Sequence, residues 1–368
     1  MNLIKYVDQQ AGNDTDTGGQ SDPYLTIQRA VDDLPAAGSG GLEIQVRGNA
    51  TNVATFDFNS SGNDPTSSNG ILIRSWLNSP MPIIEMAANS AFQDSSDTDG
   101  VRLSRLHIIF SGTPTVNLFN TNASNTSYWV WDSCIVDASA TIGTQSSVAI
   151  VTGRYANVVN CLIYSPTGGV LTYSGNVINN NFVVYGTYGI YLQTGCGASG
   201  NVVIAGPSNS SHIRAIYLYN QAAIATNNIC YTAAPGQGAG IQGNAAGNKY
   251  NRIMANNYVE GFTTNYQPYP ICPIALNNVS CGPTVAHYSD FDNVAIDNSN
   301  IELTSGQSIL EKDGAGNYTG IDMTQWLPFW NQAAPSPTGS SEFARNCIDK
   351  FSGSSTGLYI PRIRDAGR

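Results

Sequence analysis

The sequence predicts an all-β protein in which short strands stack in parallel, one turn of a coil above the next. Two observations carry this prediction. A short phrase, in which a small polar residue, usually Asn, precedes one or two apolar residues, recurs at steps of 20 to 29 residues. Short β-type segments flank most copies, with Gly, Asn, Ser and Pro between them, and leave no room for helices between the strands.

The recurring phrase indicates a repeat architecture. Recurrence at about 20 to 50 residues is typical of repeats that bury their apolar face only by stacking on their neighbours. An earlier copy is Ser104-Arg105-Leu106. The clear copies are Ser133-Cys134-Ile135, Asn160-Cys161-Leu162, Asn181-Phe182-Val183, Asn201-Val202-Val203, Asn228-Ile229-Cys230, Asn257-Tyr258-Val259 and Asn278-Val279.

Residues 1–37 are predicted to cap the coil. Residues 3–8 have the composition of a short strand. An apolar stripe at positions i, i+3, i+4 and i+7 then predicts a helix over residues 26–34, with Thr26 as its N-cap and Pro35 as its stop. Such a helix would cover the apolar core and the unpaired edge of the first turn. The stripe consists of Ile27, Ala30, Val31 and Leu34.

Residues 38–284 are predicted to form the coil itself. From about residue 147 most repeats carry two visible strands, one before the Asn phrase and one directly after it. Each strand is expected to pair in parallel with its counterpart one turn later, about 4.8 Å away. Strands of the first kind are predicted at 147–151, 169–173, 189–192 and 215–218, and strands of the second kind at 161–164, 182–185 and 202–204.

The recurring asparagines are interpreted as structural. At the same corner of successive turns, each side-chain amide can donate a hydrogen bond to the next, which forms a ladder. This reading explains the repeats without an active site. The predicted ladder residues are Asn160, Asn181, Asn201, Asn228 and Asn257.

The opening of the chain resembles the N-terminal cap of a known superfamily. The segments Tyr6-Val7-Asp8 and Gly12-Asn13-Asp14, together with residues 22–28, are similar to the cap of pectate-lyase-like right-handed parallel β-helix proteins. The resemblance covers about residues 3–284 and implies a single-stranded right-handed parallel β-helix. The superfamily includes polysaccharide lyases, glycosidases, bacteriophage tailspikes, other virion proteins and surface adhesins. The fold therefore leaves the function open.

Charge and cysteine content narrow the function classes. The net charge is −10 and no Lys/Arg cluster is present, which argues against a nucleic-acid partner. No apolar run reaches the roughly 18 residues of a membrane span, and the N-terminus has no secretory h-region. The seven cysteines lack CxxC spacing. Cys134 and Cys161 fall at equivalent positions, so we expect them to be small buried hydrophobic side chains.

Catalytic groups are scarce in the predicted turns. Between residues 107 and 288 only Asp132, Asp137 and Glu260 are acidic, so these would be the catalytic residues of a polysaccharide-cleaving enzyme. Asp132 and Asp137 are five residues apart, which places them on opposite strand faces unless a corner intervenes. We therefore expect no enzymatic activity and no cofactor. The acidic loops at 14–16 and 94–99 lack the bidentate Glu of a calcium loop, so no metal is expected.

Tyrosines are the remaining candidate for binding. Tyr191, Tyr217 and Tyr219 are the predicted ligand-binding residues, since tyrosine combines an apolar ring with a polar tip. They belong to a wider set that recurs along the turns. The alternative is that all of these rings stack in register as part of the core or as a surface ladder. The wider set also includes Tyr185, Tyr188 and Tyr258.

The hypothesis that follows is a non-enzymatic structural protein of a bacteriophage virion, either a capsid decoration or a tail or spike component. The resemblance implies a homotrimer that contacts other virion proteins, with host polysaccharide as a potential ligand. Residues 285–368 hold 10 of the 26 acidic residues as well as Trp326 and Trp330, and are predicted to be a capping or attachment segment. The alternatives are a polysaccharide lyase or glycosidase, and a cell-surface glycan-binding adhesin.

Overall fold

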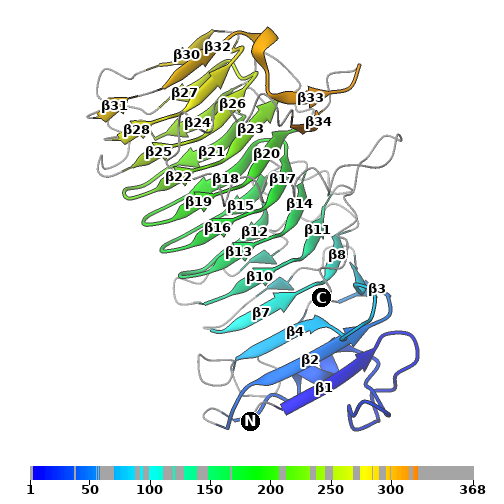
Figure 1. Cartoon of the computed structure of the whole chain (residues 1–368). Helices are drawn as coiled ribbons and strands as arrows, with labels where there is room; N and C mark the ends of the chain where they lie inside the picture. The colour runs from blue at the N-terminus through cyan, green and yellow to red at the C-terminus, as the bar shows by residue number, and fades with distance from the viewer. Residues whose placement is uncertain are drawn as a thin grey trace.

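The computed structural model confirms the all-β class and the predicted parallel β-helix (Figure 1). Strands form three long parallel sheets, here named A, B and C, and most turns of the coil contribute one strand to each. The structure describes residues 3–321 apart from residues 37–38, 55, 57, 59–69, 88–91, 94–98, 111–118, 121–127, 139–147, 166–167, 207–212, 233–237, 245–251, 268–273, 284, 290–295, 299 and 315–317.

Sheets A and B run side by side and meet at a sharp corner. Sheet A has 12 strands among the described residues and sheet B has 11. The strands of sheet A are β1 (Leu3–Asp8), β2 (Leu42–Arg47), β4 (Ile71–Ser75), β7 (Val101–Ser104), β10 (Val130–Asp132), β13 (Asn157–Val159), β16 (Val177–Asn179), β19 (Gly197–Ser199), β22 (Ile224–Thr226), β25 (Ile253–Ala255), β28 (Ile274–Leu276) and β31 (Ile296–Asn298). The strands of sheet B are β3 (Ala50–Val53), β5 (Ile83–Met86), β8 (His107–Phe110), β11 (Ile135–Asp137), β14 (Leu162–Ser165), β17 (Phe182–Tyr185), β20 (Val202–Ala205), β23 (Ile229–Thr232), β26 (Tyr258–Glu260), β29 (Val279–Cys281) and β32 (Ile301–Leu303).

Sheet C closes the coil with nine strands among the described residues. One inward position of β18 must be small because sheet B lies close: a Cβ on Gly189 would come within 2.2 Å of Cγ1 of Val203. The strands of sheet C are β6 (Phe92–Gln93), β9 (Phe119–Asn120), β12 (Val148–Val151), β15 (Gly168–Leu171), β18 (Tyr188–Leu192), β21 (Arg214–Leu218), β24 (Ala239–Gly243), β27 (Thr264–Gln267) and β30 (Ala286–Tyr288).

The corner between sheets A and B consists of two residues, which differ in backbone conformation and in the direction of the side chain. The first has a left-handed backbone, with φ between 52° and 66° in seven successive turns, which Asn and Gly adopt more easily than other residues. The second turns its side chain inward. The left-handed residues are Ser133, Asn160, Asn180, Gly200, Asn227, Asn256 and Asn277.

The inward corner residues form the asparagine ladder. The Oδ1 of Asn228 accepts hydrogen bonds from the backbone N–H of Asn201 at 3.0 Å and from its Nδ2 at 2.9 Å. The Nδ2 of Asn228 donates to the carbonyl of Ala198 and to Oδ1 of Asn257, both at 3.0 Å. The same pattern joins Asn181, Asn201, Asn228, Asn257, Asn278 and Asn300.

The ladder prediction is wrong for one residue, Asn160. Leu162 pairs with Phe182, so Asn160 lies in register with Asn180 and has the left-handed role of the first corner residue. Its side chain is exposed. Cys161 occupies the ladder position instead, and its backbone N–H donates to Oδ1 of Asn181 at 2.8 Å. The recurring sequence phrase treats Asn160 and the ladder asparagines as equivalent, although they occupy two different corner positions. Both positions favour asparagine.

The N-terminal cap has the expected elements in a shorter form. Strand β1 pairs in parallel with β2, and helix α1 (Ile27–Val31) follows. Thr26 is its N-cap and accepts a hydrogen bond from the backbone N–H of Arg29 at 3.2 Å. The helix ends earlier than predicted, at the C-cap Asp32, although Leu34 is still buried. No helix among the described residues has the length and apolar character needed to cross a bilayer.

The parallel sheets continue beyond the predicted limit at residue 284. Strands β30, β31 and β32 pair with β27, β28 and β29, so the coil extends at least to Leu303. Residues 304–312, here called the strap, then fold over the outer face of sheet B. The strap contains a short 3-10 helix (Ser305–Gln307) and β33 (Leu310–Lys312), which pairs antiparallel with β34 (Tyr318–Ile321). Trp326 and Trp330 lie outside the described residues.

The interior of the coil is apolar, with inward Val, Ile, Leu and Ala stacked turn on turn. The five described cysteines are free and buried, which confirms them as small hydrophobic side chains. Burial raises the pKa of Cys230 and of Cys161, so these thiols stay protonated. The described cysteines are Cys134, Cys161, Cys196, Cys230 and Cys281.

We predict that Asn228→Ala lowers the free energy of unfolding by about 3 kcal/mol, because it leaves buried backbone and amide groups without partners. Urea denaturation followed by circular dichroism measures this. Asn179→Ala is the matched control, since Asn179 lies on the outer face of sheet A and is only partly buried. A loss of the same size in both variants would contradict a special role for the ladder.

Candidate functional site

The outer face of sheet C gathers partly exposed tyrosines. Tyr191 of β18 and Tyr217 of β21 are register partners, and their ring centroids are 5.1 Å apart in a T-shaped arrangement. Tyr219, just after β21, lies 5.1 Å from Tyr191 and 5.7 Å from Tyr217. Tyr188 at the start of β18 lies 5.9 Å from Tyr191. We call these four residues the tyrosine cluster. It contains all three predicted ligand-binding residues.

The other two tyrosines of the predicted set lie elsewhere. Tyr185 of β17 points into the core and is 1% exposed. Tyr258 of β26 lies on the outer face of sheet B beneath the strap and is 2% exposed. Both lie in strands of sheet B, where alternation along the strand turns Tyr185 inward and Tyr258 outward. The core alternative is thus confirmed for Tyr185 and Tyr258, and ligand binding by the other tyrosines stays a prediction.

Polar side chains continue the tyrosine cluster along sheet C. The guanidinium carbon of Arg214 lies 4.5 Å from the ring centroid of Tyr217, which is a cation–π arrangement. The Nε of Arg214 donates to Oε1 of Gln242, and Nε2 of Gln242 donates to Oε1 of Gln267 at 2.6 Å. The sequence analysis missed these residues. Aligning the strand sequences YGIYL, RAIYL and AGIQG would have placed them on one face.

Arg252 is buried and binds the backbone beside the tyrosine cluster. It is 1% exposed, and its Nη2 donates to the carbonyl of Tyr219 at 2.8 Å. Its Nε donates to the carbonyl of Asn220 and its Nη1 to that of Asn244, both at 3.1 Å. A buried guanidinium that binds three carbonyls fixes the backbone after β21. Arg252 is therefore a positioning residue for the ring of Tyr219.

The hydroxyl groups of Tyr191 and Tyr217 are hydrogen-bond donors at physiological pH. Burial raises the pKa of Tyr191 well above its usual value, and the neighbouring tyrosines raise it further. Burial also raises the pKa of Tyr217, although the positive charge of Arg214 opposes this. The face therefore offers protonated phenols, amides and a guanidinium beside exposed aromatic surface.

Asp132 and Asp137 belong to different sheets. Asp132 ends β10 in sheet A, Asp137 ends β11 in sheet B, and the corner at Ser133 and Cys134 separates them. Asp132 accepts hydrogen bonds from Nη2 of Arg102 at 2.6 Å and from Oγ of Ser133 at 3.0 Å. This carboxylate is thus neutralised by an ion pair across two neighbouring turns.

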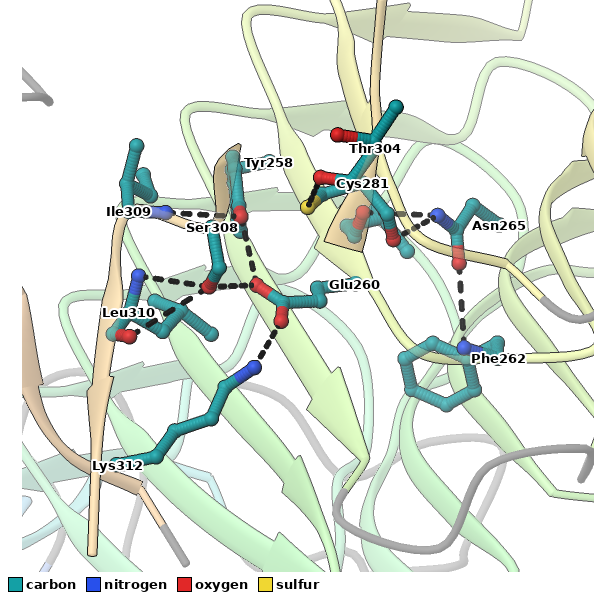
Figure 2. A network of polar contacts seen from close by, with 11 residues as sticks. Tyr258, Glu260, Phe262, Asn265, Cys281, Thr304, Ser308, Ile309, Leu310 and Lys312 are labelled. Atoms are coloured by element: carbon teal, nitrogen blue, oxygen red, sulfur yellow. Dashed lines mark hydrogen bonds and ion pairs between the residues drawn. The ribbon is translucent and has the colours of Figure 1, made fainter. Parts of the chain in front are cut away.

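Glu260 is the centre of a buried polar network under the strap (Figure 2). Its side chain is 4% exposed and forms an ion pair with Nζ of Lys312. Its Oε2 accepts hydrogen bonds from the hydroxyl of Tyr258 at 2.6 Å and from Oγ of Ser308 at 2.7 Å. The backbone N–H of Ile309 donates to the Tyr258 hydroxyl at 3.3 Å. Burial, followed by the charge of Glu260, raises the pKa of Tyr258, so this hydroxyl remains a donor.

Glu260 lies too far from Asp137 to form a glycosidase pair with it. In sheet B, β11 and β26 are separated by β14, β17, β20 and β23, which is five strand steps. At about 4.8 Å per step, Glu260 lies about 24 Å along the coil from Asp137. Glycosidase carboxylates are about 5 to 9.5 Å apart. Glu260 instead fastens the strap to sheet B.

Metal-binding groups are also absent from the part of the chain that the structure describes: no three His, Cys, Asp or Glu side chains lie together there. Asp14, from the first acidic loop, caps the start of the helical turn. Its Oδ1 accepts from the backbone N–H groups of Leu25 and Thr26, both at 2.9 Å. In the second loop, Asp94 and Asp97 fall outside the described residues.

Comparison with known proteins gives a fold likeness only. No protein-family model matches the sequence, and no curated protein sequence matches it. Solved structures that are similar include a GH136 lacto-N-biosidase from Eubacterium ramulus, with 10% identity, a TM-score of 0.48, and coverage of 82% of this chain and 68% of that one. Pectate lyase Pel9A has 12% identity, a TM-score of 0.46, and coverage of 82% and 76%. The Dettilon tailspike protein has 14% identity, a TM-score of 0.34, and coverage of 82% and 60%. Such distant likenesses carry no information about the function of this chain.

We predict that Glu260→Gln lowers the free energy of unfolding by about 2 kcal/mol, because it leaves the strap lysine without its partner. Asp132→Asn is the control. It removes an ion pair whose arginine side chain is 52% exposed, so we expect a loss below about 1 kcal/mol. Chemical denaturation compares the two. Coupling between Glu260→Gln and Lys312→Met in a double-mutant cycle checks the pair directly, and additive effects would argue against it.

Proposed function

We propose that this protein is a non-catalytic β-helical scaffold that binds a glycan through the tyrosine cluster. The observation that carries the proposal is the grouping of four partly exposed tyrosines with Arg214 and Gln242 on one outer face. Sugars present apolar C–H faces and polar hydroxyl edges. Aromatic rings pack on the former, and phenols, amides and guanidinium groups hydrogen-bond to the latter.

The arrangement along the coil favours an extended ligand. Tyr191, Tyr217, Gln242 and Gln267 are register partners on consecutive strands. Three strand steps of about 4.8 Å give a row about 14 Å long. A chain of sugars lying parallel to the coil axis would contact this row at regular intervals. Arg252 adds rigidity, which lowers the entropic cost of binding.

A non-catalytic role is supported by the positions of the acids. Asp132 is paired with Arg102, Glu260 is buried beneath the strap, and neither lies in a strand of sheet C. No described strand of sheet C contains Asp or Glu. A glycosidic bond held at the tyrosine cluster would therefore have no carboxylate from the supporting strands to protonate it.

The proposed setting is a bacteriophage particle, where the chain would be a capsid decoration or a tail or spike component. The resemblance of the N-terminal cap supports this setting. So does a face suited to host surface polysaccharide. A homotrimer attached to other virion proteins is the proposed assembly. A cell-surface adhesin would use the same face, so co-purification with phage particles distinguishes the two settings.

We predict that Tyr217→Ala weakens binding to a recognised polysaccharide at least about tenfold, which corresponds to about 1.4 kcal/mol. Biolayer interferometry against immobilised bacterial surface polysaccharides measures the affinity. Tyr155→Ala is the matched control, because Tyr155 lies between β12 and β13, stacks on Tyr128 and is 54% exposed. Loss in the control alone would move the site to that stacked pair.

We also predict that the bound polysaccharide is not cleaved. Prolonged incubation followed by mass spectrometry and an assay of reducing ends should give no new products. Release of oligosaccharides that stops in Asp132→Asn or Glu260→Gln would overturn the non-catalytic proposal in favour of a lyase or glycosidase.

A further inference from the structure

Arg214 is the one charged residue in the described strands of sheet C, where no Asp or Glu occurs. Six other described cations are paired with carboxylates: Lys5 and Arg29 with Asp33, Arg47 with Asp8, Arg74 with Glu43, Arg102 with Asp132, and Lys312 with Glu260. Arg214 instead contacts the Tyr217 ring and the Gln242 amide, and both of these are neutral. In a chain of net charge −10, such a cation stands out.

From this contrast we infer that the tyrosine cluster takes an acidic glycan, with a sugar carboxylate bound by Arg214. The inference rests on the proposed glycan-binding function and adds the class of ligand. It does not follow from the tyrosines, because stacking on a phenol ring does not distinguish an acidic sugar from a neutral one.

The geometry of Arg214 suits a carboxylate. A guanidinium carries five N–H donors in a rigid plane, and the structure assigns the Nε donor to Gln242. No carboxylate within the described residues pairs with the two terminal nitrogens. Stacking on Tyr217 holds the plane of the group. A preoriented fork of this kind binds a carboxylate through two parallel hydrogen bonds.

The surroundings of Tyr217 support an anionic ligand. Burial raises the pKa of the Tyr217 hydroxyl, whereas the positive charges of Arg214 and Arg252 both lower it. Two cations therefore act on the same part of the face. Arg252 donates hydrogen bonds to three neutral carbonyls, and its positive charge contributes to the local potential.

The test uses the full chain and pairs of immobilised bacterial capsular polysaccharides, each in its native uronic-acid form and after chemical reduction of the carboxyl groups. Sulfated and phosphorylated polysaccharides without uronic acid form a second arm, since these anions also bind guanidinium. We expect at least one native uronic-acid polymer to bind about tenfold or more tightly than its reduced counterpart. Preference for the sulfated or phosphorylated arm alone would overturn the carboxylate assignment.

Three variants locate the effect. Arg214→Gln should abolish the preference, so that the native and reduced forms bind with equal affinity. Arg214→Lys should restore it only in part, because an ammonium cannot form the bidentate contact. Arg154→Gln is the control. It makes the same change in net charge at an exposed corner residue, and should keep the full preference.

The outcomes separate the two proposals. If native and reduced forms bind equally, and Arg214→Gln binds as the wild type does, the acidic-ligand inference is wrong while glycan binding stands. An equal loss in Arg214→Gln and Arg154→Gln would also overturn it, because attraction would then come from overall charge. If no polysaccharide of any arm binds, both the inference and the proposed function are wrong.

Discussion

The asparagine ladder at the corner between sheets A and B is the interaction on which the rest of the structure depends. A buried corner interrupts the hydrogen bonding of both sheets, so its peptide groups need other partners. From Asn201 onward, Oδ1 of each ladder asparagine accepts from the backbone N–H and the side-chain amide one turn earlier, as with Asn228 and Asn201. Each amide thus sets the rise of its own turn. Once that register is fixed, every outward position becomes part of a straight row along the coil.

The row geometry explains how a binding face arises from residues that are far apart in the chain. Tyr191 and Gln267 are separated by three turns, yet they belong to one line on sheet C. The same rule places apolar side chains in rows on the outer face of sheet B, where Ile229 and Tyr258 would be exposed without a cover. The strap provides that cover, and Glu260 fastens it. The outer faces of sheets B and C therefore differ, because the strap covers part of sheet B.

Much of the fold could be predicted from sequence because a repeat shows the same constraint many times. Thr26, the strand pairs and the inward ladder all follow from short-range patterns. The error at Asn160 shows the limit. Left-handed backbone and inward amide both favour Asn at adjacent positions, so the sequence cannot tell them apart by composition. The roles of Arg214 and Glu260 depend on contacts 28 and 52 residues away, which no local pattern reveals.

The distribution of charge argues that function lies on the outer rows and not in the turns themselves. In the coil, Asp132 and Glu260 are neutralised by Arg102 and Lys312 and stabilise neighbouring turns or the strap. A charge that binds a partner within the chain is not available to a ligand, and a buried one would have to break that pair first. Among the described residues, Arg214 contacts an aromatic ring and an amide, neither of which compensates its charge. The charged group that is available to a ligand on the outer face of sheet C is therefore the guanidinium of Arg214 and not a carboxylate.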